Sequence, residues 1–386
     1  MNQKSVPFAN LILAFWLVIT LSAAAVTLLT PGQVVSPHND MMKQASELSA
    51  RCMEEIKNYK IEHRDGLSPD DKLQTGMIGL EEITSITTTN GILESKRTST
   101  NPNWAAVYIS MYDRAGLSDG DSVLFIFSGS FPALNLMAMV SAQVYGLKTY
   151  VMAGIGASNY GANDPDFTFF DMAEHLHEVG LLTHRIDLVS LGGSNDIGDD
   201  FLSAEDTANI VSRIKASGIT YLYEPDYRKN IDARLDLIRE YISDEKSDVK
   251  FAVNVGGSMV GLGSGNSAII ETGYFSAKRA SLGLTSLKNR RNDNMGILGC
   301  MQAIGLPTAS MLNIRGLAAT YELPYDPSVT PTIGQGNSYF ATTYNLTVAY
   351  IALSLSVVIA ICYIILKKHF AAERKKDERN YILCRR

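Results

Sequence analysis

Two stretches of the chain are apolar and free of charge over about twenty residues, and they stand near its two ends, at residues 8–29 and 346–366. A helix needs about 20 such residues to cross the roughly 30 Å hydrocarbon core of a bilayer. The 386-residue sequence has no third stretch of this kind, which excludes a multi-spanning transporter. We therefore predict one N-terminal and one C-terminal transmembrane helix around a central domain.

The distribution of charge predicts how these helices are oriented. The segment after residue 366 carries eight basic and three acidic side chains, a net charge of +5, and Lys4 is the only charged residue before the first stretch. Because the whole chain has a net charge of −6, the segment between the stretches carries −12. Short basic flanks stay in the cytoplasm. We expect both termini, including the basic tail 367–386, to be cytoplasmic and the acidic centre to be extracytoplasmic.

A removable signal peptide is the alternative for residues 8–29, with small residues at 23–25 as a cleavage site. The stretch is longer than the usual signal-peptide apolar region of about 7–15 residues, and its basic start is weak. We therefore favour an uncleaved signal anchor. Both alternatives place the centre of the chain outside the cytoplasm.

Short apolar runs alternate with helical patterns through the centre, and the composition, 46% hydrophobic and 19% charged, excludes general disorder. This alternation is typical of an α/β fold with a mainly parallel sheet and helices on both faces, a Rossmann-like arrangement, here at residues 36–322. The predicted strands are 122–127, 148–152, 186–191, 219–223, 251–255 and 311–314. The predicted helices begin at Ser36-Pro37 and Asn101-Pro102, then cover 132–144, 169–180, 203–216 and 227–243.

Residues 323–345 interrupt this pattern with several prolines and glycines and are predicted to be a linker to the second membrane span. The four cysteines are too few for a disulfide-built scaffold. Cys52 and Cys300 would both lie outside the cytoplasm and could pair, which the sequence leaves open.

A Gly/Ser loop follows a predicted strand three times, with starts 64 residues apart, which is either an internal repeat or coincidence. Ligands of open parallel sheets bind at the carboxyl ends of the strands, where all three loops would lie. The first loop precedes a helix whose N-terminal N–H groups suit an anion; helix capping and a nucleophilic Ser130 are the alternatives. The predicted ligand-binding residues of these loops are Ser128, Gly129, Gly192, Gly193, Ser194, Asn195, Gly256, Gly257 and Ser258.

The second loop continues into three aspartates, and carboxylates among glycines can approach a hard cation closely. We predict that Asp196 and Asp199 bind a divalent cation, the one cofactor the sequence suggests, or that Asp196 acts in catalysis. A turn in which Asp200 caps the next helix is the structural alternative. Asn163, Asp164 and Asp166 follow another strand and could join this site, although a plain loop explains them better.

Lys96 and Arg97 are the predicted positive side chains of the anion site, because they adjoin a run of hydroxyl residues and a helix start. A solvated surface is the alternative explanation for such a pair. Nucleic acid is excluded as a partner, since the central domain is strongly acidic and extracytoplasmic.

Several blocks in order carry a family resemblance: 83–89 ITSITTT, 96–102 KRTSTNP, 128–134 SGSFPAL, 155–163 IGASNYGAN and 191–198 LGGSNDIG. Together they resemble the bacterial poly-gamma-glutamate system protein family over residues 75–320. The resemblance implies a bacterial plasma (inner) membrane protein of a surface-polymer or capsule pathway, with other poly-gamma-glutamate synthesis and export proteins as partners. It implies no reaction and no catalytic set.

Two functions follow as expectations. The first is a membrane-anchored component of poly-gamma-glutamate (surface polyanion) synthesis or export, whose outward-facing domain binds the anionic polymer or a small anionic ligand. The second is a membrane-anchored hydrolase or transferase acting on the polymer or on a phosphorylated or acyl intermediate, with Ser130 as nucleophile or Asp196 and Asp199 as metal ligands or acid and base.

Overall fold

The computed structural model describes residues 5–30, 32–245, 248–283, 286–344 and 346–383. The chain forms two compact units, one of residues 36–339 and one in which residues 1–35 associate with residues 340–386. Lys4, Arg385 and Arg386, which contribute to the charge argument, and Asn345 at the end of the predicted linker lie outside the described residues.

A seven-stranded sheet, with the strand order β7-β6-β4-β3-β8-β10-β9, forms the centre of the larger unit. Every neighbouring pair is parallel except β10 and β9, which run antiparallel. The strands are β3 (Ser122–Ser128), β4 (Lys148–Gly154), β6 (Leu188–Ser190), β7 (Thr220–Tyr221), β8 (Val249–Val255), β9 (Gly273–Phe275) and β10 (Thr308–Met311). This confirms the prediction of a mixed α/β fold with a mainly parallel sheet.

Alternating side chains of the central strands enter two separate cores, because successive residues of a strand point to opposite faces of the sheet. Phe125 and Phe127 of β3 belong to one core, whereas Leu124 and Ile126 belong to the other. All seven residues of β3 are buried. The sheet is therefore covered on both faces, which explains why its strands are continuous apolar runs.

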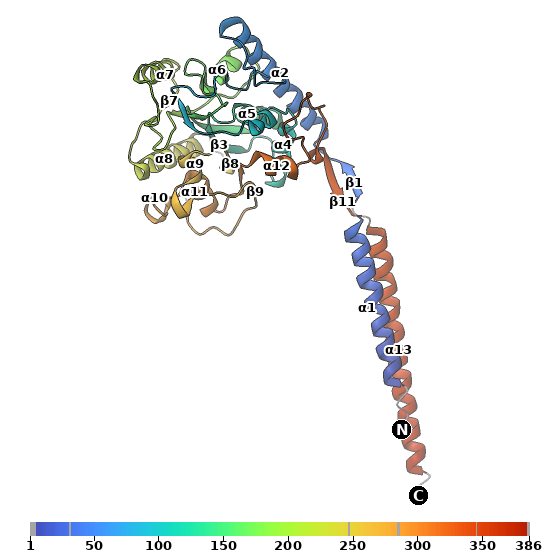
Figure 1. Ribbon diagram of the computed structural model, residues 1–386. Coiled ribbons are helices and arrows are strands. Elements are labelled where there is room, and N and C mark those ends of the chain that lie inside the picture. Colours follow the sequence, from blue (N-terminus) through green and yellow to red (C-terminus); the bar gives the residue numbers. More distant parts are fainter. Residues whose placement is uncertain (1–4, 31, 246–247, 284–285, 345, 384–386) are drawn as a thin grey trace. The chain divides into compact units, whose positions relative to one another are not determined.

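Different helices supply the two cores (Figure 1). The first core takes side chains from α2 (Asn39–His63), α4 (Trp104–Arg114), α5 (Pro132–Tyr145), α6 (Phe169–Glu178), α7 (Ala204–Ala216) and α12 (Ile314–Thr320). The second takes them from α8 (Tyr227–Glu245), α9 (Met259–Leu262), α10 (Leu287–Arg290) and α11 (Ile297–Ala303). The helices predicted at 132–144, 169–180, 203–216 and 227–243 correspond to α5, α6, α7 and α8.

Some predicted boundaries are wrong. The strand predicted at 311–314 ends at Met311, and the helix α12 begins at Ile314. The helix expected at Ser36-Pro37 begins at Asn39, because His38 and not Ser36 is its N-cap residue. Several short elements were not predicted, among them β2 (Thr87–Thr89), β5 (Ala157–Ser158), which pairs with β2, and the helix α3 (Leu93–Ser99).

The predicted linker 323–345 is divided between packed structure and the smaller unit. Its first part belongs to the larger unit, where Leu323 and Tyr339 are buried and Asp326 pairs with Arg97. A 3₁₀ turn at Asn337–Tyr339 ends this part, and β11 (Phe340–Thr343) follows. The two prolines and two glycines between 327 and 336 therefore shape a packed segment and not a free tether.

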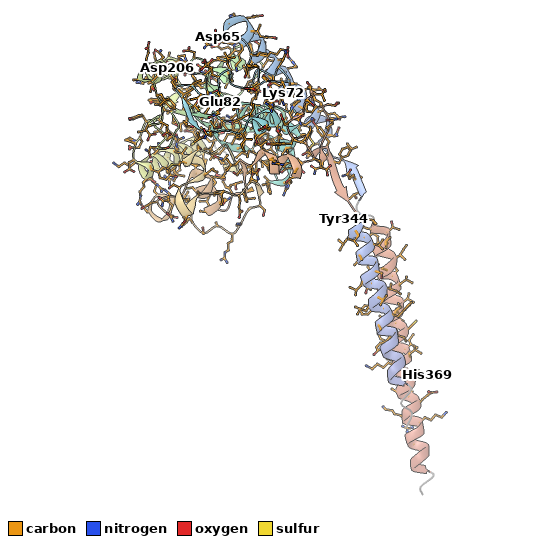
Figure 2. All side chains as sticks on the ribbon, viewed as in Figure 1. Asp65, Lys72, Glu82, Asp206, Tyr344 and His369 are labelled. Atoms are coloured by element: carbon orange, nitrogen blue, oxygen red, sulfur yellow. The ribbon has the colours of Figure 1, made fainter. Side chains whose placement is uncertain are left out.

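The smaller unit contains α1 (Ser5–Leu29), β1 (Gly32–Val35), β11 and α13 (Leu346–Leu383). β1 and β11 pair antiparallel, and α1 lies beside α13 (Figure 1). Residues Leu346–Glu373 of α13 are long and apolar enough to cross a membrane, and α1 contains a shorter apolar helical stretch, Ala14–Leu29. Tyr344 precedes α13, and His369 lies within α13 just after its apolar part (Figure 2).

The two cysteines of the larger unit lie on opposite faces of the sheet. Cys52 of α2 belongs to the first core and Cys300 of α11 to the second, and both are fully buried free thiols. Burial raises the pKa of each thiol to about 12. The pairing that the sequence left open is therefore excluded, since the sheet separates the two side chains.

Candidate functional site

A cavity of about 860 Å³ opens at the carboxyl ends of the parallel strands. Residues that follow β3, β4, β6, β8 and β10 all line it, so loops from five adjacent strands contribute to one wall. The segment from Thr88 to Lys96, which contains the start of α3, forms another part of the lining. This is the edge of an open parallel sheet where ligands bind.

The strand order reverses beside this cavity. From β3 the chain proceeds through β4 and β6 to β7 on one side, and it then returns to place β8 on the other side of β3. Such a reversal separates the loops that follow the two central strands and leaves a crevice between them. Ser128 and Ser130 after β3 and Gly257 and Ser258 after β8 line the cavity at this point.

The three predicted Gly/Ser loops reach the same cavity. Six of the nine predicted loop residues line it: Ser128, Gly192, Gly193, Ser194, Gly257 and Ser258. Ser130, the predicted nucleophile, lines it too, whereas Gly129, Asn195 and Gly256 are neighbours of lining residues in the chain. Their ligand-binding role stays a prediction.

Close approach of the loops explains two of the glycines. Gly256 has φ +88°, and a Cβ atom there would stand 2.1 Å from Ser128 Oγ. At Gly129 a Cβ atom would stand 2.5 Å from the main-chain oxygen of Ile155. Real Cβ contacts do not come this close. At Gly129 the close atom belongs to the backbone, so a larger residue would push the strand-end loops apart. At Gly256 the Ser128 side chain can rotate away, and the positive φ is what favours glycine.

Lys96 has the most unusual environment in the cavity lining. It lies within α3 and its side chain is almost fully buried, with 1% exposed. Its Nζ bonds to the main-chain oxygen of Ser130 and lies 2.6 Å from Ser158 Oγ and 4.3 Å from the centroid of the Phe131 ring. Burial alone lowers the Lys96 pKa from 10.5 to about 7.

Ser158 and Ser130 are connected to each other at the base of the cavity. The main-chain N–H of Ser158 donates to Ser130 Oγ at 3.0 Å, and both residues line the cavity. Ser158 ends β5, and its hydroxyl is the one that contacts Lys96 Nζ. The lysine is thus closer to a side chain that the sequence did not single out than to the hydroxyl of Ser130.

Charged side chains of both signs line the rest of the cavity. Arg315, an exposed residue of α12, lies with its guanidinium carbon 5.4 Å from the centroid of the Tyr325 ring. Glu94 and Asp200 are the acidic lining residues. Because Arg315 is exposed and Lys96 is not, the arginine lies where the cavity meets solvent.

Arg97 differs from its neighbour Lys96. Its guanidinium makes two hydrogen bonds to Asp326, with Nε 2.6 Å from Oδ1 and Nη2 2.9 Å from Oδ2, and it is not part of the cavity lining. The hydrogen bond from Arg97 lowers the pKa of Asp326. The structure therefore gives Arg97 a partner in the protein, where the sequence predicts an anionic ligand.

Asp196 is buried away from the cavity lining, in contact with Arg234 of α8. Its Oδ2 accepts from Arg234 Nη2 at 2.5 Å and from Asn230 Nδ2 at 3.0 Å, and its Oδ1 accepts from Ser190 Oγ at 2.7 Å. The side chains of Asp196 and Arg234 are 3% and 1% exposed. These hydrogen bonds hold the loop after β6 against α8. The carboxylate that we predict to be catalytic is therefore bonded to side chains that stabilise the fold.

The remaining acidic residues of this loop bond within it. Asp199 accepts from Asn195 Nδ2 at 2.5 Å, and Asp200 accepts from the main-chain N–H of Ser194 at 2.7 Å. Across the described residues, no group of three or more His, Cys, Asp or Glu side chains comes together to hold a metal ion. The predicted cation site at Asp196 and Asp199 therefore has no third ligand of these types.

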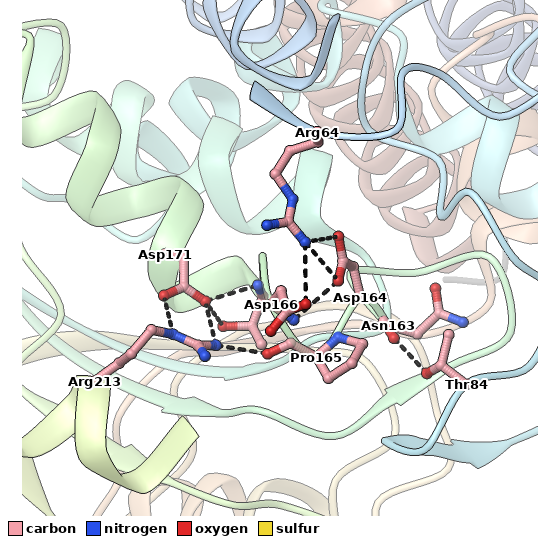
Figure 3. Close-up of polar contacts among 9 residues, drawn as sticks. Arg64, Thr84, Asn163, Asp164, Pro165, Asp166, Asp171 and Arg213 are labelled. Atoms are coloured by element: carbon pink, nitrogen blue, oxygen red, sulfur yellow. Dashed lines mark hydrogen bonds and ion pairs between the residues drawn. The ribbon is translucent and has the colours of Figure 1, made fainter. Parts of the chain in front are cut away.

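The loop 161–166 is held by other contacts (Figure 3). Asp164 and Asp166 both pair with Arg64, at 3.3 and 3.5 Å, and the main-chain oxygen of Asn163 accepts from the Thr84 hydroxyl. Asp171 pairs with Arg213, which also bonds to the main-chain oxygen of Pro165. The loop thus fastens the segment that leads through β2 to the cavity, and its carboxylates do not line the cavity.

Sequence reasoning missed Ser158 and Arg315. Ser158 follows the strand β4 in Gly154-Ile155-Gly156-Ala157-Ser158, a Gly/Ser segment much like the three that we singled out. That similarity was the available signal. Arg315 is the second residue of α12, four positions after the end of β10. The predicted strand at 311–314 covered the loop that lies between them.

Comparison of the chain with protein-family models, with curated proteins and with solved structures found no match in any of the three. The family resemblance described above therefore stays a prediction.

Proposed function

We propose that this chain is a membrane-anchored component of a poly-gamma-glutamate synthesis or export system, and that its α/β domain binds a carboxylate-bearing ligand outside the cytoplasm. The observation that carries the proposal is the gathering of five strand-end loops, with Lys96 and Arg315, around one cavity. A glutamate polymer linked through its γ-carboxyl retains one free carboxylate per residue. A cavity that offers an arginine and many hydrogen-bond donors suits such a chain.

Several kinds of donor are available to the ligand. Arg315 offers a guanidinium near the solvent, which is suited to bidentate contact with a carboxylate. The hydroxyls of Ser128, Ser130 and Ser258 line the interior. Helix α5 begins at Pro132, directly after the lining residue Phe131, and the N–H groups of a first helical turn have no partners within the helix.

Repulsion limits how the ligand can approach. Glu94 and Asp200 line the same cavity, and the segment between the two apolar stretches carries a net charge of −12. A polyanion would therefore be held locally by one or a few residues and repelled by the surrounding surface. This favours a ligand segment that enters the cavity, such as a chain end, over a polymer spread across the domain.

The membrane part of the proposal rests on two observations. Residues Leu346–Glu373 form a helix with the length and composition of a membrane span, and the segment that follows residue 366 is basic. We include α1 as a second span, beside α13, because residues 8–29 are apolar and free of charge. Both termini would then be cytoplasmic, and the partners would be other proteins of the same system.

Binding can be tested with the full-length chain in lipid nanodiscs. We expect calorimetric titration with a short γ-linked glutamate oligomer to give saturable binding, and the same oligomer with its α-carboxylates amidated to bind much more weakly. Arg315→Ala should weaken binding about tenfold, because it removes one charge-assisted contact. Arg279→Ala removes the same charge from an exposed residue outside the cavity lining and should leave the affinity unchanged.

Two results would contradict the binding proposal. One is equal binding of the charged and amidated oligomers, because the carboxylates would then play no part. The other is an equal loss of affinity in Arg315→Ala and Arg279→Ala, because the effect would then come from net charge and not from the cavity. Phosphate compounds in the same titration distinguish a carboxylate ligand from a phosphorylated intermediate.

The orientation has its own test. The native thiols Cys52 and Cys300 are buried, so an added cysteine gives a clean signal in the domain. Lys278→Cys, at an exposed position, should react with a membrane-impermeant maleimide in cells whose plasma membrane is intact, after permeabilisation of any outer membrane. Reaction only after the plasma membrane is opened would place the domain in the cytoplasm.

A further inference from the structure

Anion binding alone does not require the contact between Lys96 and Ser158. Lys96 Nζ lies 2.6 Å from Ser158 Oγ, and both residues line the cavity although they are only 1% and 7% exposed. Among the described residues no carboxylate contacts Lys96, and burial shifts its pKa to about 7. A buried lysine with no counter-charge is kept close to its neutral form, and a neutral amine is a base.

The neighbouring groups orient this amine. Lys96 Nζ contacts the main-chain oxygen of Ser130 and the Ser158 hydroxyl. A neutral amine can donate one N–H to the first and accept the hydroxyl proton of the second. The Phe131 ring, whose centroid lies 4.3 Å from Nζ, covers another side of the amine. Ser158 itself is held through its main-chain N–H, which donates to Ser130 Oγ.

A glycine leaves room for this pair. A Cβ atom at Gly91 would stand 2.9 Å from Lys96 Cε and 3.1 Å from Ser158 Oγ. The loop before α3 can therefore pass against both side chains only because residue 91 has none. The lysine and the serine are closely surrounded on the protein side and open on the cavity side.

We propose that Ser158 is a nucleophile and Lys96 its general base, and that the pair transfers the acyl group of an amide or ester in a carboxylate-bearing substrate. The inference rests on the proposed function for its substrate class, since the carboxylate contact at Arg315 would bring the acyl group into the cavity. It replaces Ser130, the nucleophile suggested by the sequence, with a serine whose hydroxyl contacts a base. A serine activated by an adjacent base is the usual arrangement for such chemistry.

The reaction balances in two steps. In the first, Ser158 Oγ bonds to the substrate carbonyl carbon, its proton passes to Lys96 Nζ, and the carbon–nitrogen or carbon–oxygen bond breaks as Lys96 returns that proton to the leaving group. In the second, water or an acceptor amine attacks the acyl-serine, Lys96 takes its proton, and Ser158 Oγ leaves with that proton. Water gives hydrolysis, and an amine gives transfer.

The test uses the full-length chain in nanodiscs and a small alkyl fluorophosphonate, which forms an oxygen–phosphorus bond with an activated serine and releases fluoride. Intact-mass and peptide analysis should find one adduct, on the peptide that contains Ser158. Ser158→Ala should abolish the adduct, and Lys96→Met should slow its formation at least about 100-fold, a typical contribution of a general base. Ser243→Ala, at an exposed position outside the cavity lining, should have no effect.

Lys60 supplies a matched control for the lysine. It is also buried, burial lowers its pKa to about 8, and it is not part of the cavity lining. Lys60→Met should therefore label at the wild-type rate. An adduct at Ser130, or equal labelling of Lys96→Met and the wild type, would overturn the proposal, as would no adduct at all.

Titration with the γ-linked glutamate oligomer separates this inference from the proposed function. Ser243→Ala should bind the oligomer as the wild type does, and saturable binding by Ser158→Ala would show that its cavity is folded. Binding without an adduct in the wild type would refute the nucleophile and leave the binding function. An adduct at Ser158 without oligomer binding would support the nucleophile and refute the substrate class.

Discussion

Arg234 and Lys96 are two cations buried to the same extent, each with 1% of the residue exposed, in very different surroundings. Arg234 contacts the carboxylate of Asp196 and the side chains of Asn230 and Ser190. Lys96 contacts a main-chain oxygen, a hydroxyl and an aromatic ring. The first cation has a full set of partners within the protein, whereas the second lines a cavity and has no counter-charge.

The comparison distinguishes a buried side chain that stabilises the fold from a buried side chain that is available for chemistry. A buried pair with all its hydrogen bonds made holds two elements together, here the loop after β6 and the helix α8. A buried amine without a counter-ion is unfavourable to the fold and is retained where its altered proton affinity is useful. The acidic loop drew attention in the sequence, yet the lysine is the stronger candidate for chemistry.

Breaking the Asp196–Arg234 pair should give the largest effect on stability. Asp196→Ala leaves a buried guanidinium without its carboxylate, and we expect the free energy of unfolding to fall by about 3–5 kcal/mol. Urea titration followed by the fluorescence of Trp104, which is fully buried in the domain, measures this loss. A fall of less than about 1 kcal/mol, as at a surface position, would show that the pair is not structural.

Lys96→Met should behave in the opposite way. Removing a buried amine that has no counter-charge should leave the free energy of unfolding within about 1 kcal/mol of the wild type or raise it. A loss as large as that of Asp196→Ala would remove the distinction between the two cations. The same urea titration, in the same nanodiscs, compares them directly.

The pH dependence of stability sharpens the contrast. The Lys96 pKa is about 7 in the folded chain and has its ordinary value of 10.5 in the unfolded chain. Between these values the unfolded chain holds a proton that the folded chain has released, so raising the pH favours folding. The wild type should gain stability relative to Lys96→Met from about pH 7 upward, and the difference should be constant below that pH.

Labelling of Ser158 should follow the same ionisation. The neutral amine is the base, so the rate should rise with pH through about 7 and then level off. The charged groups near Lys96 are Glu94 and Arg97 on its own helix and Asp200 and Arg315 in the cavity lining. A rate that is flat from pH 5 to 9 would contradict the role of Lys96.

The sequence predicts the parts of this fold that bury long apolar patterns. β3, β4 and β8 are seven-residue strands, which are long enough to give a clear apolar run. The helices α5 to α8 each have an apolar face or are apolar throughout, which gives a clear helical pattern. Convergence of the Gly/Ser loops follows from one fact, that the carboxyl ends of parallel strands share an edge. These elements can be predicted without knowledge of contacts between residues far apart in the sequence.

Short or polar elements gave no such signal. β5 has two residues, and β9 has three and runs antiparallel at the edge. Helix α3 is buried although Ser95, Lys96, Arg97, Thr98 and Ser99 are all polar, so its hydropathy indicates a solvated segment. Ser158 was missed with these elements, and Lys96 was predicted only as an anion-binding side chain, without its contact to Ser158.

Partners far along the chain account for the remaining errors. In the sequence Asp196 is typical of a free loop carboxylate. In the structure it accepts a hydrogen bond from Arg234, which lies 38 residues later in the chain. Arg97 likewise pairs with Asp326, 229 residues away. A single sequence carries no sign of such pairing, since each residue type alone is typical of a surface or of a site.

The Arg97–Asp326 pair should contribute less to stability than the Asp196–Arg234 pair. The Arg97 side chain is 7% exposed and that of Asp326 21%, so solvent screens the pair more than it screens Asp196 and Arg234. We expect Arg97→Ala to lower the free energy of unfolding by about 0.5–1 kcal/mol at pH 7. Because Arg97 lowers the Asp326 pKa, this loss should disappear as the pH falls below the ordinary aspartate value of 3.8.

Arg97 also tests which of two adjacent cations belongs to the site. Arg97→Ala should leave oligomer binding and Ser158 labelling within about twofold of the wild type, since twofold is only about 0.4 kcal/mol. Arg185→Ala, which breaks a more exposed pair with Glu174, is the matched control for the change in charge. If Arg97→Ala abolished binding and Arg185→Ala did not, the ligand would reach Arg97 by displacing Asp326, and the cavity would extend beyond its present lining.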